Sequence, residues 1–201
     1  MPRNLILRYS NPGDWVLDSF MGSGTTLVEA KLLNRNAVGV DINPQSVSIS
    51  DANLQFQCDT SSKVYTCNGN AANLHFIKDN SIDLICTHPP YANIIRYSNG
   101  IEGDISLLEV DDFLTEINKV AEELFRILKK GKMCAVIGDV RKHGKVIPLG
   151  FRLMECFLQA GFTNQEIIIK EQHNCRFTDY WKRKNNGFLL LAHEYVFVFQ
   201  K

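Results

Sequence analysis

Short apolar runs alternate along the chain with amphipathic stretches, and this alternation limits the possible folds more than any other feature. The runs are bounded by Gly, Asn, Asp and Pro and have the length of buried parallel strands. They cover residues 15–18, 37–42, 63–67, 82–87, 133–138, 166–170 and 188–199. Between them, the patterns predict helices over residues 25–33, 44–56, 111–129 and 146–160.

Strand–helix alternation of this kind predicts an α/β fold of the Rossmann-like type, with a mostly parallel seven-stranded sheet and helices on both faces. Residues 172–187 join the last two predicted strands without a clear helical pattern. We therefore expect these strands to pair antiparallel, which gives the sheet an antiparallel edge strand. The length of 201 residues predicts a single domain over residues 1–201.

Composition excludes several classes of protein. Hydrophobic residues make up 45 % of the chain and charged residues 22 %, unlike disordered, collagenous or coiled-coil chains. No apolar run approaches the ~18–20 residues that a membrane span needs, so no membrane partner is expected. Lys and Arg (22) balance Asp and Glu (22), so the net charge does not indicate a nucleic-acid partner, although local clusters could serve one.

The six cysteines show no C-x-x-C pair and no zinc-finger spacing. Cys86 and Cys134 lie inside apolar runs, so we interpret the cysteines as reduced core thiols of a cytoplasmic protein. His173 and Cys175 lack further candidate ligands, and no metal is predicted.

A glycine-rich segment, Asp-Ser-Phe-Met-Gly-Ser-Gly-Thr-Thr, starts at Asp18 after the first predicted strand. Its glycines permit a ligand to approach the backbone, and Thr25 or Thr26 is expected to cap the following helix. Asp41 ends the second strand, where a carboxylate can accept hydrogen bonds from a ribose diol. The alternatives are a tight turn and a helix cap before Pro44. Together the two signals favour a nucleoside-containing cofactor.

The fourth predicted strand ends in Thr87-His88-Pro89-Pro90-Tyr91. Two prolines terminate the strand and stiffen the backbone. They place His88 and Tyr91 at the carboxyl edge of the sheet, where ligands bind in such folds. A stiff corner with a polar and an aromatic side chain fits a pocket for a flat heterocycle; the alternative is a plain strand-ending turn.

These motifs, in this order, resemble those of the S-adenosylmethionine-dependent amino-methyltransferases of DNA. That family carries a D-P-F-x-G-S-G-T-T-like motif, a V-G-x-D/E motif and a D/N/S-P-P-Y/F/W motif. The resemblance implies a methyltransferase with S-adenosyl-L-methionine as cofactor and DNA as partner. It implies that the cofactor binds Asp18, Phe20, Gly22, Ser23, Gly24, Thr25, Asp41, Ile42 and Asn70, and that the catalytic residues are Thr87, His88, Pro89, Pro90 and Tyr91.

The chemistry of the turn follows from the target group. An exocyclic amine of cytosine or adenine is a poor nucleophile because its lone pair is delocalised into the ring. Acceptors for both of its protons, the carbonyl of Pro89 and the side chain of residue 88, favour a pyramidal nitrogen. Tyr91 is predicted to stack on the base, which is flipped out of a duplex or comes from a single strand.

The chain departs from the family pattern at Ser19 (usually Pro), at Asn70 (usually an acid) and at His88 (usually Asp, Asn or Ser). A neutral imidazole has one acceptor nitrogen and a protonated one has none. We therefore expect methyl transfer to slow as the pH falls through the pKa of His88. The chain is also predicted to be a single catalytic domain without a separate target-recognition domain, so that two loops, a partner or a second copy select the site.

Two basic clusters are candidate nucleic-acid contacts. Residues 175–186 interleave basic and aromatic side chains, which suits phosphate contacts and base stacking; the candidates are Arg176, Tyr180, Trp181, Lys182, Arg183 and Lys184. Arg141 and Lys142 are expected on a loop after the fifth strand. A solvated charged surface is the alternative for both clusters.

The Thr-x-Pro-Pro-Tyr turn is more similar to that of cytosine-N4 enzymes than to that of adenine-N6 enzymes, so we favour cytosine. Methylation at carbon 5 is disfavoured because no cysteine follows a proline. Two other functions remain open: an RNA amino-methyltransferase, and a non-catalytic subunit that binds S-adenosylmethionine or nucleic acid. A homodimer, or a separate specificity partner as in restriction–modification, is compatible with each.

Overall fold

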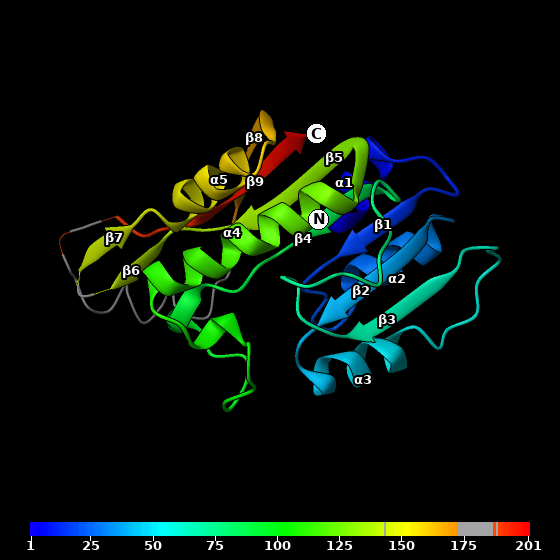
Figure 1. The fold of residues 1–201 in the computed structure, drawn as a ribbon, viewed down its shortest axis with the longest axis horizontal. Helices are drawn as coiled ribbons and strands as arrows, with labels where there is room; N and C mark the ends of the chain where they lie inside the picture. Colours follow the sequence, from blue (N-terminus) through cyan, green and yellow to red (C-terminus); the bar gives the residue numbers. More distant parts are fainter. Residues whose placement is uncertain (143, 173–186, 188) are drawn as a thin grey trace.

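The computed structural model describes residues 1–142, 144–172, 187 and 189–201. Within them, seven strands form one sheet in the order β3-β2-β1-β4-β5-β9-β8 (Figure 1). The strands are β1 (Trp15–Asp18), β2 (Asn36–Asp41), β3 (Val64–Asn68), β4 (Ile82–Thr87), β5 (Leu128–Ile137), β8 (Thr163–Glu171) and β9 (His193–Gln200). The first five are parallel, whereas β9 is antiparallel to both of its neighbours, β5 and β8. The predicted fold class and the antiparallel pairing of the last two strands are confirmed.

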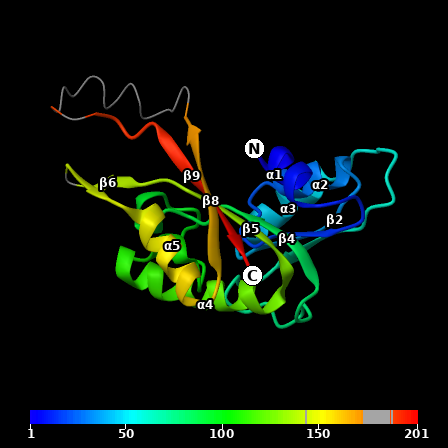
Figure 2. The ribbon, with the colours of Figure 1, turned by 90° about the horizontal axis from the view of Figure 1, so that it is seen from above.

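Helices cover both faces of the sheet, because successive side chains of each strand point to opposite faces. On one face, strand residues such as Val16 and Leu84 pack with α1 (Pro2–Tyr9) and α2 (Thr25–Leu32). On the other, Leu17 and Ile85 belong to a larger cluster with α4 (Val110–Ile127) and α5 (Leu149–Gln159). Figure 2 shows α4 and α5 on one side of the sheet and α1 and α2 on the other. A fifth helix, α3 (Pro44–Asn53), follows β2.

Three elements differ from the prediction. The helix α1 was not predicted; it begins with a proline, which is pre-organised for a first helical turn, and buries Leu5 and Ile6. The predicted loop after the fifth strand is wrong: residues there form a hairpin of β6 (Val140–Lys142) and β7 (Lys145–Ile147). Because the hairpin includes residues 145–147, α5 begins three residues later than expected, at Leu149.

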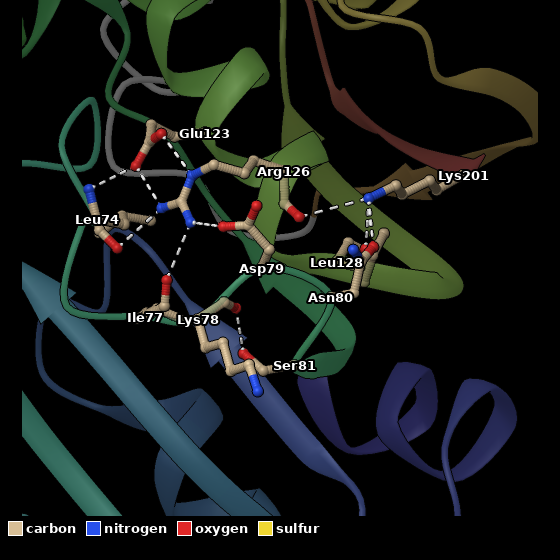
Figure 3. A network of polar contacts seen from close by, with 10 residues as sticks. All are labelled: Leu74, Ile77, Lys78, Asp79, Asn80, Ser81, Glu123, Arg126, Leu128 and Lys201. Carbon is tan, nitrogen blue, oxygen red and sulfur yellow. Dashed lines mark hydrogen bonds and ion pairs between the residues drawn. The ribbon is translucent and has the colours of Figure 1, made fainter.

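The segment between β3 and β4, residues 69–81, has no helix or strand and is held by side-chain hydrogen bonds instead (Figure 3). Arg126 of α4 donates to the carbonyl oxygens of Leu74 and Ile77, each at 3.0 Å. Its guanidinium also forms ion pairs with Glu123 and Asp79. Glu123 in turn accepts a hydrogen bond from the Leu74 backbone N–H at 2.7 Å. One arginine thus supplements the few backbone hydrogen bonds within this segment, such as that from the Ile77 N–H to the Leu74 carbonyl oxygen.

The five cysteines that the structure describes have free thiols, as predicted, and Cys175 lies outside the described residues. Cys86 of β4 and Cys134 of β5 lie opposite each other in the strand register, and both are buried on the α1 face. Of the helices described, none combines the length and the apolar character needed to cross a bilayer.

Candidate active site

A cavity of about 510 Å³ lies at the carboxyl ends of β1, β2 and β4. Its size is typical of sites for small molecules and cofactors. Most of the residues predicted from the glycine-rich turn and the Pro-Pro-Tyr turn line this one cavity. They are Asp18, Phe20, Gly22, Ser23, Thr25, Asp41, Ile42, Asn70, Thr87, His88 and Pro90. The wall also includes Met1, Pro2 and Leu5 at the start of the chain, Val120 of α4 and Lys170 of β8.

The glycine-rich turn bends tightly between β1 and α2. Gly22 (φ +51°) and Gly24 (φ +80°) both adopt the left-handed conformation, which glycine accepts without steric cost. A Cβ on Gly24 would lie 2.1 Å from Ser50 Oγ of α3, so this glycine lets the turn pack against α3. Gly24 is therefore a packing residue beside the cavity. The predicted cap is wrong: Gly24 is the N-cap of α2, without a side-chain hydrogen bond.

Asp18 is buried at the base of the cavity. Its carboxylate accepts hydrogen bonds from the Thr26 hydroxyl (2.6 Å) and from the Phe20 backbone N–H (3.1 Å). Burial is the largest effect on this group and raises its pKa to about 6, with the nearby charge of Asp41 adding to the rise. The cavity thus contains a carboxyl group whose ionisation a positively charged ligand would favour.

Asp41 and Asn70 form another part of the wall. The two oxygens of Asp41 accept hydrogen bonds from the backbone N–H groups of Gly22 and Asn43, both at 2.9 Å. Asp41 does not cap α3, because the Asn43 side chain does so by accepting from the Gln45 N–H. Asn70 is oriented by a hydrogen bond from the Ala72 N–H to its side-chain oxygen (2.9 Å). The site therefore has a pre-oriented carboxylate and a pre-oriented amide.

The Pro-Pro-Tyr turn closes the cavity at the end of β4. Thr87 is buried and its hydroxyl shares a 3.0 Å hydrogen bond with Ser19. The His88 side chain is 43 % exposed and lines the cavity, whereas Pro89 is buried behind it. Tyr91 lies beside the cavity, with its ring edge-on to that of His88 (70° between the planes). Tyr97, which was not predicted, lines the wall and is 54 % exposed.

Glu194 was also missed by the sequence analysis, although it is a lone carboxylate in an apolar strand. It is 5 % exposed. It accepts a 2.8 Å hydrogen bond from the Tyr91 hydroxyl and forms an ion pair with Lys170. Burial alone would raise the pKa of Glu194, but hydrogen bonds from Lys170 and Tyr91 outweigh it and hold this pKa below its usual value. Glu194 is therefore a buried anion behind the Pro-Pro-Tyr turn.

The predicted nucleic-acid residues are not part of the cavity wall where the structure describes them. Arg141 and Lys142 lie on β6; Arg141 donates to the carbonyl oxygens of Gly144 and Leu189, and Lys142 pairs with Glu109. Figures 1 and 2 show the β6–β7 hairpin projecting from the body of the protein. The remaining candidates, Arg176, Tyr180, Trp181, Lys182, Arg183 and Lys184, lie outside the described residues.

Solved structures of S-adenosylmethionine-dependent methyltransferases share this doubly wound fold. A structure of that class from Methanosarcina mazei matches with a TM-score of 0.66 and 16 % identity, over 98 % of this chain and 96 % of that one. TrmN from Thermus thermophilus matches with a TM-score of 0.65 and 17 % identity, over 100 % and 48 % respectively. These similarities establish the fold.

The family is established by sequence. The model of the N6/N4 DNA methylases matches residues 1–52 and 82–201, so the chain belongs to this DNA methylase family. Type II methyltransferase M1.MboII of Moraxella bovis is 55 % identical over 51 residues, which are 23 % of this chain and 20 % of that protein. Orphan methyltransferase M.BamHII of Bacillus amyloliquefaciens is 30 % identical over 126 residues, which are 62 % and 40 %. The matches thus span less than half the length of these relatives.

The family and the fold imply S-adenosylmethionine as the cofactor. The cavity fits such a molecule in size and in chemistry. Its wall contains the carboxylate that ends β2, the buried carboxyl group that ends β1 and the apolar side chain of Ile42. Asn70 belongs to residues 53–81, which the family match does not include.

Proposed function

We propose that this protein transfers a methyl group from S-adenosylmethionine to an exocyclic amino group of a DNA base. The observation that carries the proposal is that one cavity is lined both by the glycine-rich turn with Asp41 and by Thr87, His88 and Pro90 of the catalytic turn. Membership of the DNA methylase family supports the same chemistry. We propose residues 1–201 as a single catalytic domain.

The cofactor supplies a methyl group on a positively charged sulfur. In our proposal, Asp41 accepts hydrogen bonds from the ribose hydroxyls and Ile42 packs on the adenine. Asn70 faces the adenine amino group, and Asp18 with Phe20, Gly22, Ser23 and Thr25 surrounds the rest. The backbone N–H groups already hold Asp41 in place, so little ordering of this carboxylate accompanies binding.

At the catalytic turn, the carbonyl oxygen of Pro89 and the ring of His88 accept the two protons of the target amine. These hydrogen bonds make the nitrogen pyramidal and localise its lone pair for attack on the methyl carbon. Positioning and electrostatics supply most of the acceleration. Tyr97, with its exposed ring on the cavity wall, is better placed than Tyr91 to stack on the target base.

We favour cytosine N4 over adenine N6 because the turn reads Thr-x-Pro-Pro-Tyr rather than Asp-Pro-Pro-Tyr. The basic hairpin residues Arg141 and Lys142 are proposed to contact DNA phosphates. Selection of the target sequence is assigned to the loops, to a second copy or to a separate specificity partner.

The experiment is transfer of label from methyl-tritiated S-adenosylmethionine to unmethylated genomic DNA and to total RNA, with mass spectrometry of the digested products. N4-methylcytosine in DNA is expected. N6-methyladenine in DNA would keep the reaction and change the base. Label in RNA alone, or cofactor binding without transfer to either polymer, would overturn the proposal in favour of an RNA enzyme or a non-catalytic subunit.

A further inference from the structure

The hydroxyl of Tyr91 has three hydrogen-bond partners, and their chemistry fixes the direction of each bond. The Glu194 carboxylate, 2.8 Å away, only accepts, so the hydroxyl proton of Tyr91 must point to it. The Gly138 backbone N–H, at 3.1 Å, only donates. His88 Nε2, also at 3.1 Å, must then donate to the remaining lone pair of the oxygen. A neutral His88 therefore carries its proton on Nε2 and presents Nδ1 as its single acceptor.

Two ionised groups hold this arrangement in place. Lys170 and Glu194 are paired across β8 and β9 and form an ion pair. Oε1 of the same carboxylate lies 3.7 Å from His88 Nε2. Burial, followed by the charge of Glu194, raises the pKa of Tyr91 far above its usual value, so its hydroxyl remains a donor at neutral pH.

We propose that Glu194, held by Lys170 and acting through the Tyr91 hydroxyl, is a positioning residue that selects the His88 tautomer required for methyl transfer. This inference rests on the proposed function. As the nitrogen–methyl bond forms and the sulfur–methyl bond breaks, the amine nitrogen carries one proton too many. Nδ1 of His88 is the acceptor for that proton, and the imidazolium so formed lies 3.7 Å from the buried anion of Glu194, which stabilises it.

The protonation of His88 before reaction is consistent with this role. Burial lowers its pKa, Glu194 opposes this effect, and Lys170 adds to it. In the described part of the chain, the charged or titratable groups around the ring are Glu194 of β9, Lys170 of β8 and Tyr91 of its own turn, with Tyr97 also influenced by Glu194. The lowered pKa of His88 favours the neutral ring, in which Nδ1 is the acceptor.

The first test is independent of activity. Nitrogen-15 NMR of the histidine rings in the full chain reports which ring nitrogen of His88 bears the proton, and a His88→Gln variant assigns the signal. We expect a proton on Nε2 in the wild type and a mixture of tautomers in Tyr91→Phe. A proton on Nδ1 in the wild type, or the same tautomer in Tyr91→Phe, would overturn the inference. Tyr195→Phe is the matched control, because its hydroxyl bonds Asp139 and His193 and not His88.

The second test is the pH profile of kcat. Glu194→Gln keeps an acceptor for Tyr91 but loses the charge, so the acid limb should move to lower pH by about half to one unit. Lys170→Gln should move it in the opposite direction. Tyr91→Phe should lower kcat at pH 7 roughly tenfold with the KM for S-adenosylmethionine little changed. A purely structural network would leave both acid limbs in place.

The two tests also separate the inference from the proposed function. Absence of methyl transfer to any nucleic acid, with the expected tautomers of His88 by NMR, would refute the proposed function and leave the assigned hydrogen-bond directions intact. Methyl transfer to DNA with unshifted acid limbs in the Glu194 and Lys170 variants would support the proposed function and refute the positioning role of Glu194.

Discussion

Asp18 and Asp41 end neighbouring strands, yet their surroundings give the two carboxyl groups different properties. Asp18 is buried and its pKa is raised to about 6. Asp41 is half-buried and accepts two backbone hydrogen bonds. We therefore expect substitutions at these two positions to have different effects.

Asp18→Asn tests the buried group. The folded-state pKa of about 6 exceeds the ordinary value of 3.8, so the native state binds more protons than the unfolded state between these values. The contribution of Asp18 to stability is therefore complete below pH 4 and declines as the pH rises through 6. The variant has no such titration. Its free energy of unfolding relative to the wild type should increase by up to about 3 kcal/mol from pH 4 to pH 7.

Urea denaturation at both pH values measures this difference. A constant difference between the two proteins across that range would contradict the raised pKa, whatever the absolute effect of the substitution.

Asp41→Asn tests the ribose contact. Loss of the charge weakens hydrogen bonds to the ligand that contribute about 1.5–3 kcal/mol each, so the Kd for S-adenosylhomocysteine should rise roughly 10- to 100-fold. Isothermal titration calorimetry measures it. Asp51→Asn is the control. The Asp51 carboxylate accepts a hydrogen bond from the Thr66 hydroxyl and does not line the cavity. Equal losses in both variants would contradict the assigned role.

Individual site residues were predictable where a motif names them. The chain itself signals Asp18, Asp41 and His88, because each ends or follows an apolar run. Glu194 and Lys170 could not be placed by such reasoning. Both are far from the catalytic turn in sequence and reach it only because β9 pairs with β5 and β8 pairs with β9.

At the scale of elements, the segment between β3 and β4 depends on α4 for its shape. Arg126→Ala removes hydrogen bonds to Leu74 and Ile77 and leaves their carbonyl oxygens without this partner. We expect the free energy of unfolding to fall by about 1–3 kcal/mol. Chemical denaturation measures the loss. Lys119→Ala is the control, since Lys119 forms an exposed ion pair with Glu116, and its effect should stay within about 0.5 kcal/mol.

Equal losses in the two variants would show that Arg126 acts as an ordinary surface residue. The same region carries Asn70 and Ala71 of the cavity wall, so weaker S-adenosylhomocysteine binding should accompany the loss of stability.

Among the proposed DNA contacts, those on the β6–β7 hairpin lie within the residues that the structure describes. Replacing Arg141 and Lys142 by Ala should weaken binding to all DNA sequences alike. It should also reduce the slope of log K against log salt by about two. Fluorescence anisotropy over a range of salt concentrations measures both. The control replaces Lys129 and Lys130 by Ala, which removes the same charge at the opposite end of β5. An equal change of slope in the control would contradict a DNA contact specific to the hairpin.

The helices α4 and α5 could be predicted from their helical hydrophobic period, and most strands from short apolar runs bounded by breaker residues. The weakly amphipathic α2 and α3 were predictable mainly because each follows an apolar run and a Gly or Pro. The exceptions have physical reasons. In α1 the apolar spacing of Leu5, Ile6 and Tyr9 is only two turns long, a weak signal. In the hairpin, the strands β6 (Val-Arg-Lys) and β7 (Lys-Val-Ile) are only three residues each, and three of these six residues are basic, so the sequence resembles a solvated loop.

For the whole molecule, the cavity joins both halves of the sheet. Its wall includes residues of β1, β2 and β4 as well as Lys170 of β8. Ligand binding should therefore stabilise the entire fold. At 100 times its Kd, S-adenosylhomocysteine contributes about 2.7 kcal/mol and should raise Tm by about 5–10 °C in one cooperative transition. Differential scanning calorimetry measures this, and two separate transitions with only one shifted would contradict the linkage.

The position of β9 has a consequence during synthesis. It is the last strand in sequence among those described, yet it lies between β5 and β8. While the ribosome is still translating residues 193–200, β8 has no neighbour to join, and Glu194 has not reached Tyr91. On the proposed mechanism, a nascent or prematurely terminated chain without β9 lacks Glu194 and cannot orient His88. If the proposed mechanism holds, only polypeptides translated through β9 become competent to methylate.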